Sequence, residues 1–74
     1  MKNKYIKFSN FNDLTLFLLK AKEVKGDILV YRGKFCVDGK SLIGMIFINA
    51  FEGCKVEYPK YAIKFEEYLS KLEI

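Results

Sequence analysis

The stretch DILVYRGKFCVDGKSLIGMIFINAFEG, residues 27–53, decides the fold because it joins two β-rich runs to a short apolar helix. The two runs flank Arg32 and Gly33, and Gly33 can supply the backbone geometry of a hairpin turn. KSLIGMIFI, residues 40–48, predicts a helix of one or two turns with Ser41 available as its N-cap. This run is too short to cross a membrane and too apolar on all sides for an ordinary surface helix. Either another part of the molecule covers it or a partner binds it.

The segments on either side of this stretch add further strands and helices. Residues 3–8 predict a strand, and residues 10–26 predict a helix that is capped by Asn10 and ended by Gly26. Residues 53–58 alternate apolar and polar side chains as a half-buried strand does, Pro59 ends that strand, and residues 60–74 predict a last helix.

The resulting order, βαββαβα, predicts an α+β open-faced sandwich in which helices cover one face of an antiparallel sheet. The helical spacing places Leu14, Phe17, Leu18 and Ala21 on the buried stripe of the first long helix, with Leu16 and Leu19 off it. The side chains expected between helices and sheet are Phe17, Leu18, Val30, Val37, Val56, Phe65 and Leu69.

Length and composition predict one small domain over residues 1–74, with 51% hydrophobic residues to build its core. We expect no transmembrane helix and no membrane partner, and the N-terminus lacks the apolar segment of a signal peptide, which favours the cytoplasm. The net charge is +4, but the lysines are spread along the chain. A solvated surface explains them better than a nucleic-acid interface does.

Catalytic chemistry has little support in the residue types. There is no histidine, no nucleophile–base pair, no phosphate loop and no set of metal ligands, so we expect no enzyme, no cofactor and no metal. Cys36 and Cys54 both lie in apolar–polar alternations, where a small strand hydrophobe is favoured over a redox role.

The hairpin, the Lys40–Ser41 step into a short apolar helix and the glycine-closed turn before the last strand resemble HPr, the phosphocarrier protein of the bacterial sugar phosphotransferase system. The similarity runs without gaps from about Phe8 to about Glu57. It implies a single HPr-like domain with a four-stranded antiparallel sheet and three helices on one face.

The chain departs from the HPr pattern where that family carries its phosphorylated histidine. Asn10 stands at the histidine position, Asn12 at the position of the following arginine, and Asp13 at that of the proline. Asparagine has no nucleophilic nitrogen near neutral pH, so phosphohistidine transfer is excluded.

Ser41 matches the serine that a dedicated kinase phosphorylates in HPr proteins of Gram-positive bacteria, although a serine here can also be only an N-cap. Leu42, Ile43 and Ile46 match the family's exposed docking patch. Thr15, Leu19 and Lys22 match the part of that surface on the first helix. Helical spacing puts Leu42, Ile43, Ile46 and Phe47 on one side of this short helix and Met45 and Ile48 on the other, and one side must pack on the sheet. A thicker core is the alternative explanation for the apolar residues.

Together these features predict a regulatory or adaptor role through protein binding, with a kinase or a transcription regulator as the kind of partner and Ser41 as the switch. The alternative is a diverged domain that binds an unrelated protein, or forms a homodimer, through the same patch.

Overall fold

A computed structural model describes all 74 residues and shows an antiparallel sheet of four strands. The strands are β1 (Lys2–Ile6), β2 (Leu29–Arg32), β3 (Phe35–Asp38) and β4 (Cys54–Tyr58). Their order across the sheet is β1-β4-β2-β3, so β1 and β3 are the two edges. The predicted hairpin is present: Arg32 pairs with Phe35, and Gly33, at φ 61°, lies in the turn between them.

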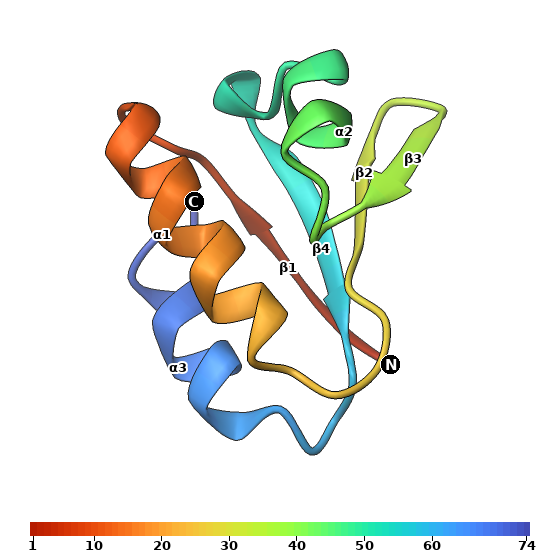
Figure 1. Ribbon diagram of the computed structural model, residues 1–74, viewed down its shortest axis with the longest axis vertical. Helices are drawn as coiled ribbons and strands as arrows, with labels where there is room; N and C mark the ends of the chain where they lie inside the picture. The colour runs from red at the N-terminus through yellow and green to blue at the C-terminus, as the bar shows by residue number, and fades with distance from the viewer.

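Three helices complete the predicted βαββαβα order: α1 (Phe11–Lys22), α2 (Leu42–Phe47) and α3 (Ile63–Ser70). Figure 1 shows α1 and α3 side by side and α2 at the opposite end of the molecule from the start of α3. A short 3₁₀ turn, η1 (Ala50–Glu52), links α2 to β4. The expected α+β open-faced sandwich is therefore confirmed. None of these helices has the length and apolar character needed to cross a membrane.

The core lies between the inner face of the sheet and the helices. On β4, Cys54, Val56 and Tyr58 are buried and alternate with half-exposed residues. Phe17 of α1 contacts Phe65 of α3 with ring centroids 5.6 Å apart. The predicted apolar stripe of α1 is buried and Leu16 and Leu19 are exposed, as expected. Of the predicted core residues, Val37 alone is only half-buried, because it lies on the edge strand β3.

Three details of the prediction were wrong. Helix α1 ends at Lys22, before Gly26, which adopts φ 110° in the following loop. The last helix spans residues 63–70 rather than 60–74, because the turn after β4 is closed by the Ala62 N–H donating to the Pro59 carbonyl. Cys36 is exposed, because Val30 and Val37 take the inner face and the Tyr31–Cys36 pair therefore faces outward.

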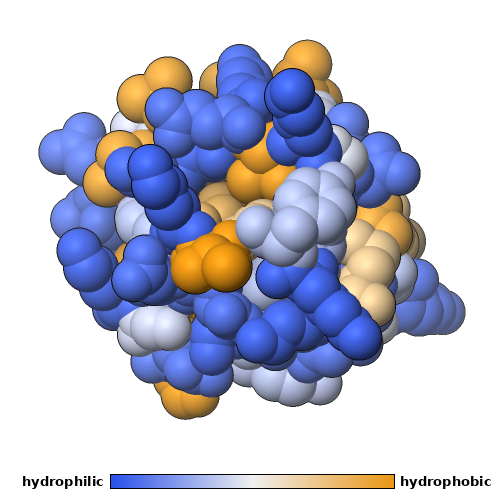
Figure 2. Space-filling view, turned by 90° about the horizontal axis from the view of Figure 1, so that it is seen from below, coloured by the Kyte–Doolittle hydropathy of each residue, from blue (hydrophilic) through white to orange (hydrophobic).

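Hydrophilic side chains cover most of the face drawn in Figure 2. Seen from the end of the molecule that carries the start of α3, charged side chains surround an apolar recess (Figure 2). Exposed apolar side chains also lie at the opposite end of the molecule, on α2 (Figure 1).

Candidate protein-binding surface

Helix α2 is fixed against the sheet by local interactions. The Ser41 Oγ accepts a hydrogen bond from the Gly44 N–H at 3.1 Å, as an N-cap does. Gly44 faces β3, where an added Cβ would lie 3.1 Å from the Cβ of Val37. A glycine at this position therefore lets α2 lie close to β3, with one side of the helix turned inward.

The two sides of α2 differ sharply in exposure. Met45 and Ile48, which follows the helix, are buried. The exposed fractions of the other side chains are 41% for Leu42, 80% for Ile43, 52% for Ile46 and 70% for Phe47. The predicted division of this run into an inner and an outer side is confirmed, and the alternative of a thicker core is wrong. We call Leu42, Ile43, Ile46 and Phe47 the α2 patch.

The apolar surface extends beyond the residues that the sequence indicated. Phe35, on the edge strand β3, is 52% exposed and meets Phe47 edge to face, with ring centroids 5.8 Å apart. Sequence reasoning assigned Phe35 to the hairpin without a role. The contact joins residues from two elements, and no local pattern in the sequence reveals it.

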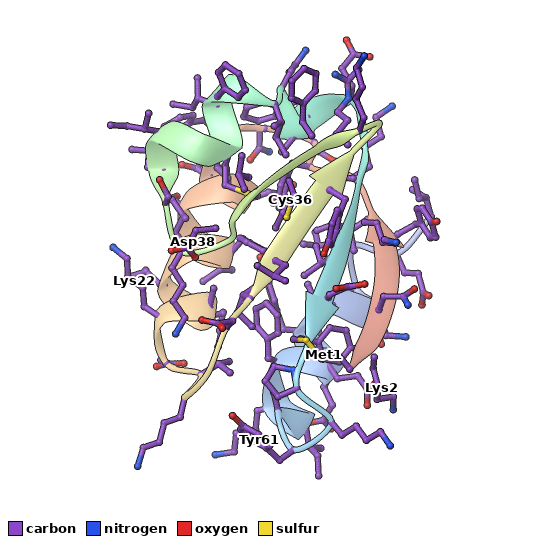
Figure 3. The ribbon with its side chains drawn as sticks, turned by 90° about the vertical axis from the view of Figure 1, so that its right-hand side faces the viewer. Met1, Lys2, Lys22, Cys36, Asp38 and Tyr61 are labelled. Carbon is purple, nitrogen blue, oxygen red and sulfur yellow. The ribbon has the colours of Figure 1, made fainter.

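The three predicted contact residues on α1 are exposed. Leu19 has an exposed fraction of 64%, and the Thr15 hydroxyl donates to the Asn12 carbonyl at 2.9 Å. Figure 3 shows Lys22 projecting from the molecule on the side that also carries α2. The segment before α2 is tied to the end of α1 because the Lys40 ammonium donates to the Val24 carbonyl at 2.7 Å. Leu42, Ile43 and Ile46 therefore lie together on one side of α2. Thr15, Leu19 and Lys22 lie on α1, a separate element.

The charges around Ser41 are mixed. The Lys40 ammonium donates to the Val24 carbonyl, not to the Ser41 hydroxyl. The Asp38 carboxylate accepts the Lys40 N–H at 2.9 Å, and the Asp38 carbonyl accepts the Ser41 N–H at 3.0 Å. A phosphate on Ser41 would therefore lie near the Asp38 carboxylate, and Lys40 would have to leave Val24 to pair with it.

The N-terminus of α1, to which the sequence resemblance assigns the HPr histidine position, is closed by its own side chains. The Asn10 Oδ1 accepts the Asp13 N–H at 3.0 Å, and the Asp13 carboxylate accepts the Ser9 N–H at 2.9 Å. The Tyr68 hydroxyl donates to the Asp13 carbonyl at 3.3 Å, and burial together with the Asp13 charge raises the pKa of Tyr68 to about 12. Asn10 is thus the N-cap that the sequence predicted, and its oxygen is already used.

Comparison of the chain with protein-family models, with curated proteins and with solved structures finds no match. Any functional conclusion therefore depends on the residues and geometry described above.

Proposed function

We propose that this protein is an HPr-like adaptor that does not carry phosphohistidine and that binds a protein partner through the α2 patch. The observation that carries the proposal is the exposure of four large apolar side chains on one short helix whose other side is buried. An exposed apolar cluster with a polar surround is typical of a protein interface.

The composition of the surface supports this role. Phe35 and Phe47 add two aromatic rings to the aliphatic side chains of α2, and aromatic residues are enriched at interface centres. The side chains of the patch are all hydrocarbon, so apolar contact would supply most of the binding free energy.

Ser41 is the proposed regulatory residue because it directly precedes the patch. A phosphate there adds about −1.5 to −2 charges beside Leu42. This charge would weaken an apolar partner and favour one that presents arginine. The HPr resemblance and the position of Ser41 at the start of α2 support the assignment.

The test compares Ile43→Glu with Ile63→Glu as a matched control. Both isoleucines are exposed, and Ile63 begins α3 at the opposite end of the molecule (Figure 1). We expect Ile43→Glu to abolish partner binding in a pull-down from the source cell and to leave the melting temperature nearly unchanged, because Ile43 contributes little to the core. Ile63→Glu should bind like the wild type.

Sedimentation velocity of the three proteins separates a foreign partner from a second copy of the chain. A wild-type dimer that Ile43→Glu dissociates would mean that the patch binds itself. If Ile43→Glu captures the same proteins as the wild type and sediments like it, the proposed binding role of the patch is wrong.

A further inference from the structure

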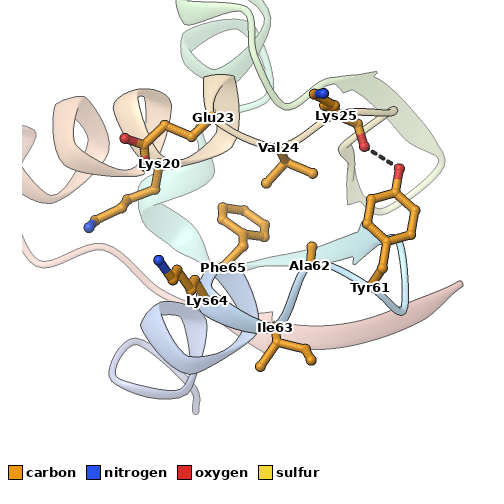
Figure 4. A pocket seen from close by; sticks show the side chains of 9 residues that line it. All are labelled: Lys20, Glu23, Val24, Lys25, Tyr61, Ala62, Ile63, Lys64 and Phe65. Atoms are coloured by element: carbon orange, nitrogen blue, oxygen red, sulfur yellow. Dashed lines mark hydrogen bonds between the residues drawn. The ribbon is translucent and has the colours of Figure 1, made fainter.

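A second surface feature lies far from the α2 patch, between the end of α1 and the start of α3. It is a hollow of about 490 Å³, within the usual range of small-molecule sites. Its apolar lining comes from Val24, Tyr61, Ala62, Ile63 and Phe65. Val24, Ala62 and Phe65 turn toward its centre (Figure 4). An apolar tail could therefore lie against these side chains with part of its surface shielded from water.

Lysines dominate the rim of this hollow. Lys20, Lys25 and Lys64 line it with a single acidic residue, Glu23. The ion pairs in the structure involve Lys2, Lys4 and Lys55, so none of the rim lysines is paired with a carboxylate. The rim thus carries a net positive charge, with Glu23 as the single carboxylate among its residues.

Two of the rim lysines, Lys20 and Lys64, lie near each other. Figure 4 shows their side chains at the same side of the hollow. The same two lysines also line an adjoining depression with Leu16, Glu67, Tyr68 and Lys71. One anionic group placed between Lys20 and Lys64 could therefore contact both ammonium groups while its tail reaches Phe65.

The far wall of the hollow is formed in the free protein. The Tyr61 hydroxyl donates to the Lys25 carbonyl, which closes the loop after α1 onto the loop before α3 (Figure 4). Gly26, at φ 110°, makes this approach possible, because a Cβ there would collide with the Tyr61 hydroxyl. A ligand would not have to order this wall, which lowers the cost of binding.

From the unpaired lysines above an apolar floor we infer that this hollow is a binding site for a small amphipathic anion, an alkyl or aryl chain that ends in a carboxylate. The carboxylate contacts the Lys20 and Lys64 ammonium groups, and the chain lies against Val24, Ala62 and Phe65. The site does not depend on the function proposed for the α2 patch.

The experiment is an NMR titration of the ¹⁵N-labelled protein with octanoate, with 1-octanol as the uncharged probe of equal chain length. We expect saturable shifts at the amides of residues 20–25 and 61–65, and much weaker binding of the alcohol. Lys20→Glu and Lys64→Glu should each weaken octanoate binding about tenfold, because an attractive charge is replaced by a repulsive one.

Lys34→Glu is the matched control, since it makes the same charge change at an exposed position in the β2–β3 turn. It should leave octanoate binding unchanged. The inference is overturned if no saturable shift occurs, if the shifts fall on α2 instead, if octanol binds as tightly, or if Lys34→Glu weakens binding as much as Lys64→Glu. The spectra of the variants report directly whether each remains folded.

Discussion

At the scale of single residues, the caps of α1 and α2 could be predicted from the sequence. Asn10 and Ser41 each accept a hydrogen bond from the N–H three residues later, an interaction that depends only on local order. The exposed position of Cys36 follows from the predicted core: with Val37 on the inner face of the strand, its neighbour Cys36 must take the outer face.

The cap at Ser41 gives a prediction about stability. Ser41→Ala should lower the free energy of unfolding by about 1 kcal/mol and Ser41→Gly by only a few tenths, because glycine tolerates the cap conformation and leaves the amide open to water. Urea denaturation measures both changes. Ser9→Ala, which removes a hydroxyl with no hydrogen bond in the structure, is the control. If Ser41→Ala is as stable as the wild type, the hydroxyl does not stabilise the helix.

At the scale of elements, the order of strands and helices could be predicted but the end of α1 could not. After Lys22 the chain leaves the helix, and the carbonyls of Val24 and Lys25 accept hydrogen bonds from Lys40 and Tyr61. These partners lie far along the chain, so the periodicity that predicts a helix up to Gly26 carries no sign of them.

A polar contact that joins β1, β4 and α3 likewise could not be predicted from the sequence. The Glu66 carboxylate lies 2.6 Å from the Lys2 ammonium and accepts the Tyr58 hydroxyl at 2.7 Å. The Lys2 ammonium, and then the Tyr58 hydroxyl, lower the pKa of Glu66 below its ordinary 4.5. Nothing in the local sequence of any of the three elements indicates this pairing.

The lowered pKa of Glu66 predicts the response of the fold to acid. A carboxyl whose pKa is lower in the folded state stabilises it above pH 4.5, and this stabilisation is lost as the pH falls through the lowered pKa. We therefore expect the free energy of unfolding to decline less steeply below pH 4.5 in Glu66→Gln and in Lys2→Gln than in the wild type. Urea denaturation across the acid range measures the slopes, with the exposed Lys60→Gln as the control. Equal slopes in all four proteins would contradict the assignment.

At the scale of the whole molecule, the fold class could be predicted because hydrophobic periodicity and turn residues indicate the same order of strands and helices along the whole chain. The α2 patch could be predicted in part. Helical spacing divides its residues into two sides, but the contribution of Phe35 needed the packing of β3 against α2. The hollow beside α3 could not be predicted, since it forms where residues about 40 positions apart meet.

The absence of histidine from the whole chain gives a prediction about phosphoryl transfer. Radiolabelled phosphoenolpyruvate and the general phosphotransferase enzyme should leave this protein unlabelled while labelling an HPr protein in the same assay. Asn10→His alone should give little transfer, because the Asp13 carboxylate remains at the start of the helix and would repel the phosphate. Stoichiometric acid-labile label on the wild type would contradict the prediction.

The two cysteines lie in opposite environments, and this gives the unmodified chain two chemical reporters. Cys36 lies open to reagents on the outer face of the sheet (Figure 3), whereas burial raises the pKa of Cys54 to about 11 where it pairs with Ile6 of β1. Because the thiolate is the reacting form, maleimides should alkylate Cys36 quickly and Cys54 only in molecules whose strands have separated. A dye on Cys36 would lie on the outer face of β3, opposite the face on which Phe35 meets Phe47. The slower alkylation of Cys54, followed by mass spectrometry, would time the opening of β1 from β4 in the same sample.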